Sequence, residues 1–170
     1  VGSEMCIRDR DNNPSPGTKK GGLTTILEKS LGAVSKAGNR NMVDVLDYAE
    51  QVKTKGFNFM NSPGYDPVSV TGQVASGANV ICFTTGRGSC FGFKPTPSIK
   101  IATNTNMYNK LSEDMDINAG TIMDNVASVN EVGKEIFDKI ISVASGEKSK
   151  SEINDYGDDE FNPWIIGATL

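Results

Sequence analysis

The feature that most constrains the fold is a short apolar run, Val80-Ile-Cys-Phe83, which leads into a glycine-rich loop. An apolar run of this length without alternation is typical of a strand covered on both faces, as in a parallel sheet. The loop holds Gly86, Gly88 and Gly92 around Arg87. Glycine allows positive φ and a close approach of the backbone to a ligand, and arginine presents a planar fork to a carboxylate. Because ligands of open α/β sheets bind at the carboxyl ends of strands, this loop is the first candidate site.

The glycine spacing argues against a dinucleotide. The Rossmann fingerprint G-x-G-x-x-G opens a helix, whereas here the third glycine comes one residue late and Pro95 and Pro97 follow. The alternative interpretation is a structural turn whose Arg87 faces solvent, and the sequence leaves both open.

Composition narrows the chemistry. The sequence has 170 residues, a net charge of -4, three cysteines and no histidine. This length suffices for one domain with a core. Without histidine, acid–base chemistry must use Lys, Asp, Glu, Tyr or Cys, and imidazole metal ligands are excluded from this chain. We expect no nucleic-acid partner from the acidic balance, no membrane partner from the short apolar runs, and a cytoplasmic location from the odd, scattered cysteines.

The rest of the chain alternates helical and strand patterns. Helices are predicted at 24–36, 66–77, 104–111 and 128–145, and strands at 43–46, 56–60, 79–84, 98–103 and, as a short strand or turn, 114–120. Thr25 with Glu28 and Ser128 with Glu131 form capping boxes. Asp66 is the predicted N-cap before Pro67, and Asn104 can cap the short helix that runs to Leu111. The strand, helix and strand between 56 and 84 predict a right-handed βαβ unit. The order predicts a three-layer, Rossmann-like α/β domain with a mainly parallel sheet.

The two ends read differently from the centre. Residues 1–11 show no periodicity and are expected to be a non-native or disordered segment, so the domain is expected to span 12–170. Residues 11–22 read as a loop and 148–160 as an exposed polar segment, whereas 161–170 is apolar enough to dock on the domain or at an interface.

Several longer segments occur together and carry a family resemblance. They are Asn13-Pro-Ser-Pro-Gly17, Gly21-Gly-Leu-Thr-Thr25, Glu28-Lys-Ser-Leu-Gly32, Pro63-Gly-Tyr-Asp66, Phe83-Thr-Thr-Gly-Arg-Gly88, Ile99-Lys-Ile-Ala-Thr-Asn104, Asp114-Met-Asp-Ile-Asn-Ala-Gly120 and Phe161-Asn-Pro-Trp164. In this order they resemble the altronate/galactarate dehydratase family, over about residues 12 to 170.

The resemblance implies a hydro-lyase that removes water from an aldonate or aldarate to give a 2-keto-3-deoxy acid, commonly with a divalent metal such as iron(II). It also implies that this chain is the C-terminal portion, that an N-terminal SAF-like domain is absent here, and that the chain alone is inactive. D-altronate is slightly favoured over galactarate, and sulfolactate-cleaving relatives leave the substrate open. The alternative is a non-catalytic α/β module that binds a sugar acid, or serves in assembly, while another chain does the chemistry.

Dehydration requires removal of the proton α to a carboxylate and stabilisation of the enolate that develops. We expect Arg87 and the backbone N–H groups of 86–89 to hold the substrate carboxylate. Lys29 and Lys100 are candidate catalytic bases, although Lys29 also fits a solvated helix position and Lys100 an outward strand position. The full set of expected substrate-binding residues is Asp66, Thr85, Gly86, Arg87, Gly88, Thr103 and Asn104.

The acidic segment after residue 113 suggests a metal site. Asp114, Asp116 and Asn118 alternate, so two oxygen ligands could lie on one side of a strand; Asp116 and Asn118 are the predicted metal ligands. They do not complete a site, and the remaining ligands are expected upstream of this chain. Cys82 is expected in the core and Cys90 near the substrate. The protein is also expected to form a homodimer.

Overall fold

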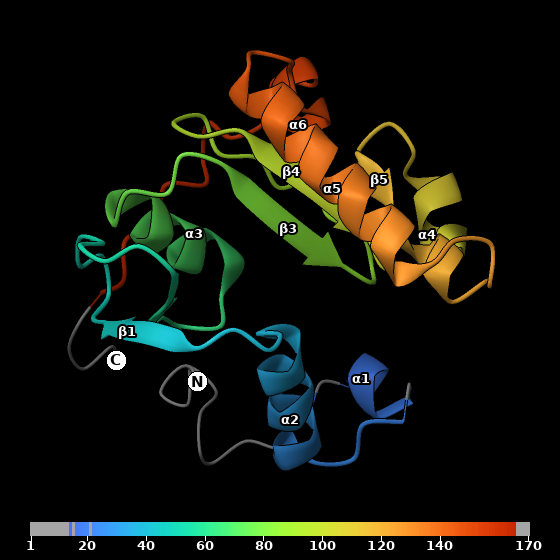
Figure 1. The fold of residues 1–170 in the computed structure, drawn as a ribbon, viewed down its shortest axis with the longest axis horizontal. Coiled ribbons are helices and arrows are strands. Elements are labelled where there is room, and N and C mark those ends of the chain that lie inside the picture. Colours follow the sequence, from blue (N-terminus) through green and yellow to red (C-terminus); the bar gives the residue numbers. More distant parts are fainter. Residues whose placement is uncertain (1–13, 15, 21, 166–170) are drawn as a thin grey trace. The chain divides into compact units, whose positions relative to one another are not determined.

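The computed structural model describes residue 14 and residues 16–20 and 22–165 (Figure 1). The chain divides into two compact units, the first formed by residues 1–77 with 162–170 and the second by residues 78–161. We call them unit 1 and unit 2. The segment 1–11 lies outside the described residues.

Unit 1 contains three helices and a two-stranded parallel sheet among its described residues. They are α1 (Pro16–Lys20), α2 (Ile26–Lys36), β1 (Met42–Leu46), β2 (Phe57–Met60) and α3 (Asp66–Ala75). The capping box that opens α2 is confirmed, because Thr25 accepts from the amide of Glu28 and the Glu28 carboxylate accepts from the amide of Thr25. The loop predicted for 11–22 is wrong at residues 16–20, which form α1.

The described part of the C-terminal segment, up to residue 165, packs on unit 1, which is one of the two predictions made for it; residues 166–170 lie outside the described residues. The rings of Trp164 and Tyr48 lie edge to face with 5.5 Å between their centroids. The backbone amide of Trp164 donates to the Tyr48 hydroxyl. The amide of Asn162 donates to the hydroxyl of Thr71 on α3. Tyr48 in turn donates to the carbonyl of Val68, so one tyrosine joins the segment to the helix.

Unit 2 is built on a three-stranded parallel sheet in the order β3-β4-β5. Its elements are β3 (Ile81–Thr85), β4 (Ser98–Ala102), α4 (Thr105–Lys110), β5 (Ile117–Asn118), the 3-10 turn η1 (Ala119–Ile122), α5 (Val129–Ala144) and α6 (Lys150–Ile153). The predicted capping of α5 by Ser128 and Glu131 and of α4 by Asn104 is confirmed. Figure 1 shows α5 lying along this sheet.

The strand pairing confirms the Rossmann-like α/β class and corrects one detail of it. All pairs are parallel, but β2 pairs with β1 while β3 pairs with β4, so β2 and β3 belong to different sheets. The predicted βαβ unit is therefore wrong, because α3 does not link two neighbouring strands. Residues 86–97 connect β3 to its neighbour β4 without a helix.

The core of unit 2 forms around β4, which is buried at every residue. Ile99 and Ile101 pack with Ile117 and with Val143 of α5 on one face of the strand. Because side chains alternate along a strand, Ser98, Lys100 and Ala102 occupy the other face. The central strand thus has a buried aliphatic face and an opposite face that carries the polar side chains of Ser98 and Lys100.

The strand β3 is not covered on both faces, which corrects the prediction from its apolar run. Ile81 is buried, whereas Cys82 and Thr84 are exposed and Phe83 is intermediate. β3 is an edge strand of the three-stranded sheet, and its successive side chains point in turn to a covered and to an exposed side. The placement of Cys82 in the core is therefore wrong.

The segment 148–160 is also more buried than its polarity predicted. Ser149 and Ser151 are buried, the Ser151 hydroxyl donates to the carbonyl of Ser98 at 2.8 Å, and Ser149 and Ser151 hydroxyls lie 3.0 Å apart. Small hydroxyl side chains allow α6 to approach β4 closely while satisfying their own hydrogen bonds.

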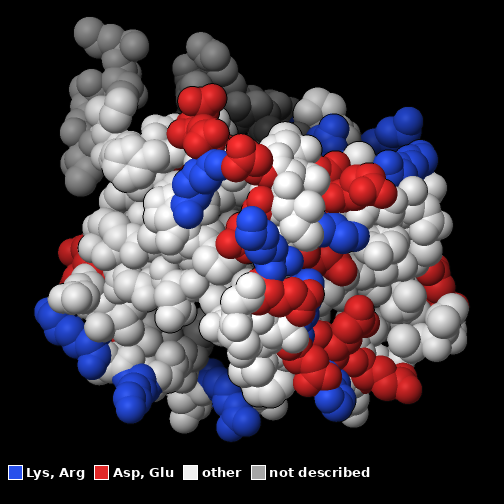
Figure 2. Space-filling view, turned by 90° about the horizontal axis from the view of Figure 1, so that it is seen from above, with Lys and Arg blue, Asp and Glu red and all other residues white. Residues whose placement is uncertain are grey.

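The surface of the described residues carries both signs of charge. Figure 2 shows acidic and basic side chains interspersed on the face that it presents. On unit 2, Lys139 pairs with Glu147 at 2.7 Å and Lys134 with Asp138 one helical turn away. Among the described residues no helix has the length and apolar character that a membrane span requires.

Candidate functional site

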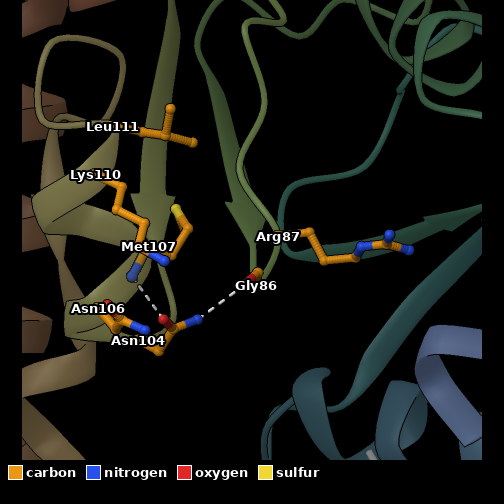
Figure 3. Close-up of a pocket in the computed structure, with 7 residues that line it drawn as sticks. All are labelled: Gly86, Arg87, Asn104, Asn106, Met107, Lys110 and Leu111. Atoms are coloured by element: carbon orange, nitrogen blue, oxygen red, sulfur yellow. Dashed lines mark hydrogen bonds between the residues drawn. The ribbon is translucent and has the colours of Figure 1, made fainter. Parts of the chain in front are cut away.

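A cavity of about 370 Å³ opens in unit 2 where the glycine-rich loop meets α4 (Figure 3). The loop leaves the carboxyl end of β3, and α4 follows the carboxyl end of β4, which are the strand ends where ligands bind in such sheets. The residues around the cavity are Gly86, Arg87, Asn104, Asn106, Met107, Lys110 and Leu111.

Two threonines tie the strand ends together beside the cavity. The carbonyl of Thr85 accepts from the amide and the hydroxyl of Thr103, at 3.0 and 3.2 Å. The hydroxyl of Thr85 accepts from the amides of Gly88 and Arg87, at 3.1 and 3.4 Å. These two N–H groups were expected to meet a substrate carboxylate, and here they donate to the protein instead. Thr85 and Thr103 therefore hold the frame of the loop.

Gly88 is required by the close approach of the loop to α4. Its φ is +95°, and a Cβ built there would lie 2.1 Å from the Cδ1 atom of Leu111. A side chain at this position would be strained and would push the loop away from the helix. The glycine thus allows the loop to lie against Leu111 of the segment that ends α4.

Asn104 connects the loop to the helix. Its side-chain oxygen accepts from the amide of Met107 at 2.8 Å, which caps α4, and its side-chain nitrogen donates to the carbonyl of Gly86 at 2.9 Å. Both ends of the amide are therefore occupied by backbone groups, as the dashed lines in Figure 3 show. Asn104 lines the cavity chiefly as a positioning residue.

Three polar side chains around the cavity are exposed and have no ion-pair or hydrogen-bond partner among the described residues: Arg87, Asn106 and Lys110. In Figure 3 the Arg87 side chain extends from the loop away from α4, whereas Asn106 and Lys110 lie on the helix side. None of the described residues that line the cavity is acidic. Two unpaired cations without a carboxylate make it suited to an anion.

Sequence reasoning missed the helix side of the cavity, namely Asn106, Met107, Lys110 and Leu111. The signal was present, because Asn106 and Lys110 are four residues apart on a predicted helix that directly follows a strand end.

Lys100 is fully buried in the middle of β4 and does not line the cavity. Its ammonium lies 5.1 Å from the centroid of the Tyr156 ring, and its Nζ has no hydrogen-bond partner in the described part of the chain. Burial lowers the pKa of Lys100, although the negative charges of Asp114 and Asp116 oppose that shift. The outward position considered for Lys100 is therefore wrong.

The groups around Lys100 share its incomplete hydrogen bonding. The Oδ1 atom of Asp114 and the hydroxyl of Ser98 are buried and likewise have no partner among the residues described. A hydrogen bond with Asp114, and the charge of that carboxylate, raise the pKa of Tyr156. These side chains form a second polar cluster, on the face of β4 away from Ile99 and Ile101.

Asp116 and Asn118 bind backbone amides. The two carboxylate oxygens of Asp116 accept from the amides of Lys100 at 2.8 Å and Lys150 at 3.0 Å. The side-chain oxygen of Asn118 accepts from the amide of Gly120 at 3.0 Å. Their role as metal ligands stays a prediction.

The remaining candidates lie elsewhere. Lys29 is an exposed residue of α2, and Asp66 is an exposed residue in the first turn of α3, so both belong to unit 1. The N-cap of α3 is Tyr65, one residue before the predicted Asp66, and desolvation raises the pKa of Asp66. Cys90 lies in the glycine-rich loop of unit 2, is exposed and does not line the cavity.

Comparison with known proteins supplies the identity. The family described as D-galactarate/Altronate dehydratase, C-terminal, matches residues 4–169. This chain belongs to that family. Over 85% of its length it is 46% identical to galactarate dehydratase (L-threo-forming) of Escherichia coli (strain K12), and it covers 28% of that relative.

Two further relatives show the breadth of the D-galactarate/altronate dehydratase resemblance. Altronate dehydratase of Bacillus subtilis (strain 168) is 42% identical over 85% of this chain and 29% of the relative. The (2R)-sulfolactate sulfo-lyase subunit beta of Chromohalobacter salexigens is 34% identical over 84% of this chain and 37% of the relative. The chain thus spans less than a third of the length of the two dehydratases.

The resemblance implied a divalent metal, and the described residues can be tested for it. Among them no group of three or more His, Cys, Asp or Glu side chains gathers as a metal site. The oxygens of Asp116 are already used by two backbone amides. The donor set described here does not fit an iron(II) site, and no chemical step is derived through a metal.

Proposed function

We propose that this chain forms part of a hydro-lyase that removes water from a sugar acid, D-altronate or galactarate, to give a 2-keto-3-deoxy acid. The observation that carries the proposal is the cavity of unit 2 in a chain of the dehydratase family: among the described residues, the cations Arg87 and Lys110 border it and no acidic residue does. Such a cavity suits an organic anion with hydroxyl groups.

In the proposed reaction Arg87 binds the carboxylate next to the carbon that loses its proton. A base takes that proton, the freed electron pair forms a double bond to the neighbouring carbon, and the hydroxyl on that carbon leaves as water after gaining a proton. The enol product then rearranges to the keto acid. Negative charge builds up on the carboxylate as the proton leaves. A positive charge held beside that carboxylate, here the guanidinium of Arg87, stabilises it and so lowers the barrier.

Lys29 and Lys100 remain the candidate bases. Burial lowers the pKa of Lys100, which is the direction that a lysine base needs, and opposite charges of Asp114 and Asp116 limit that shift. Since Lys100 does not line the cavity, its role as a base requires that its side chain reach the substrate in the complete enzyme.

The proposal is tested by replacing Arg87 in a complete dehydratase that carries this chain. Loss of a charged hydrogen bond to a carboxylate costs about 1.5–3 kcal/mol, so Arg87→Ala is expected to lower kcat/KM by roughly 10- to 100-fold. Arg87→Lys keeps the charge without the planar fork, so its kcat/KM should lie between those of the unmodified enzyme and of Arg87→Ala. Arg40→Ala is the control, because Arg40 is exposed in unit 1 and does not line the cavity. Kinetics of Arg87→Ala that match those of the control would remove Arg87 from the site.

A non-catalytic binding module is the second candidate. It is favoured by the lack of a metal-ligand group among the described residues and by one relative being the subunit of a sulfo-lyase. We further propose that the 170-residue chain alone is inactive and that it works in the cytoplasm. Turnover of either acid by the isolated chain, supplied with iron(II), would contradict its inactivity, and binding without turnover by the complete protein would favour the module.

A further inference from the structure

We propose that Lys110, assisted by Asn106, is a specificity-determining residue that binds the far carboxylate of a dicarboxylic sugar acid. The inference rests on the proposed function, in which the same cavity holds a sugar acid and Arg87 binds its first carboxylate. It selects an aldarate over D-altronate, the aldonate that the family resemblance slightly favours.

The helix places the two side chains together. Asn106 and Lys110 are four residues apart on α4, so they project from the same side of the helix, and both line the cavity. Both are exposed, and neither has a hydrogen-bond or ion-pair partner in the part of the chain that the structure describes. Asn104, by contrast, has both ends of its amide bound to backbone groups. The helix therefore presents one free amide and one free ammonium to a ligand.

The arrangement of charge distinguishes the two substrate classes. One cation, Arg87, comes from the loop after β3, and the other, Lys110, comes from the last turn of α4, so they bound the cavity from two different elements. An aldonate has one carboxylate and leaves one cation unpaired. An aldarate has a carboxylate at each end and can meet both, while the Asn106 amide can donate to or accept from a hydroxyl between them.

The side chains must close on the ligand from their present directions. Figure 3 shows Arg87 extending away from α4, so holding both carboxylates requires its exposed side chain to turn toward the helix. Lys110 and Arg87 both have long side chains that no ion pair among the described residues restrains. A charged ligand of opposite sign supplies the free energy for that change in direction.

The test uses the complete dehydratase with Lys110→Gln, Lys110→Arg and, as a matched control, Lys134→Gln. Lys134 is an exposed lysine of α5 that pairs with Asp138 and does not line the cavity. Removing one exposed ion pair is expected to lower kcat/KM for galactarate about fivefold in Lys110→Gln, and to leave that for D-altronate unchanged. Lys110→Arg should restore galactarate turnover, and the control should change neither. An equal loss on both acids, or no loss on galactarate, overturns the inference.

Direct binding separates this inference from the proposed function. If the unmodified protein turns over neither acid, the proposed function fails, and calorimetric titration with galactarate and D-altronate decides the role of Lys110. Galactarate binding that weakens about fivefold in Lys110→Gln, with unchanged D-altronate binding, supports the dicarboxylate site. Galactarate binding that is absent, or equal in the two proteins, overturns it.

Discussion

Replacing Lys100 by methionine is expected to stabilise unit 2. Lys100 is fully buried, and its ammonium has no hydrogen-bond partner among the described residues. Methionine has a similar length, fills irregular core space and carries no charge. The substitution therefore removes a buried, unpartnered donor without opening a large cavity.

The magnitude follows from terms of opposite sign. A buried polar group without a partner costs about 1–3 kcal/mol in proteins. Against this, the substitution removes the contact of the ammonium with the Tyr156 ring, worth about 0.5–2 kcal/mol, and the attraction of Asp114 and Asp116. Because the pKa of Lys100 is lowered in spite of both aspartates, burial outweighs that attraction. The expected net gain in the free energy of unfolding is about 1 kcal/mol at neutral pH, in line with replacements of buried charges by apolar groups.

The gain depends on pH in a defined direction. The unfolded lysine has its ordinary pKa of 10.5, and the folded one is lower. Between these two values the unfolded chain binds more protons than the folded chain, so the stability contributed by this group rises with pH. The penalty of Lys100 is fully present below its folded pKa and is gone near pH 10.5. The advantage of Lys100→Met should therefore be largest below the folded-state pKa of Lys100 and shrink as pH rises toward 10.5.

The assay must report on unit 2. The chain has one tryptophan, Trp164, which lies in unit 1, so its fluorescence is the wrong probe. Amide hydrogen exchange at β4 during urea unfolding measures the relevant transition. Lys94→Met is the control, because Lys94 is partly exposed and its ion pair with Asp155 raises its pKa. A clear loss of stability in Lys100→Met at neutral pH would show that the amine is well solvated or paired, and the reasoning would be wrong.

Two further substitutions test the frame of the site. Gly88→Ala should destabilise unit 2 and raise KM, because the new Cβ would lie 2.1 Å from a methyl carbon of Leu111 and the backbone φ is +95°. Gly133→Ala is the control, since Gly133 lies in α5 with open space around it; its free energy of unfolding should stay the same or rise by up to about 1 kcal/mol. Asp116→Ala should cost about 2–4 kcal/mol in urea unfolding, because two backbone amides lose their acceptor at once; an unchanged midpoint would mean that water replaces the carboxylate.

Local signals were enough to locate several helix starts. The boxes at Thr25 and Ser128 and the cap at Asn104 lie where the sequence placed them, because each depends on hydrogen bonds between residues three or four apart. Because ligands bind at the carboxyl ends of parallel strands, the sequence also predicts Gly86, Arg87 and Asn104 at one edge of the sheet. These three residues line one cavity. Their contact with substrate stays a prediction.

Long-range pairing could not be predicted in the same way. Ser151 meets the backbone of Ser98 across 53 positions, and no local pattern marks that contact, so the polarity of 148–160 predicts exposure where the structure has a buried contact. The side of β4 that carries Lys100 was equally undetermined, because alternation identifies two faces without saying what covers each. Asn106 and Lys110 could not be placed at the site because the pattern of 104–111 marks where the helix begins and ends, and does not say which face of it meets the glycine-rich loop.

The burial of β4 has a consequence for how the protein is made. Ile99 and Ile101 leave the ribosome well before their partners, since Ile117, Val143 and the serine that meets Ser98 all come later in the chain. Until about residue 143 has emerged, the aliphatic side of the central strand of unit 2 lacks part of its cover. Nascent chains stopped between 102 and 143 should therefore be the ones most prone to chaperone capture and aggregation during synthesis.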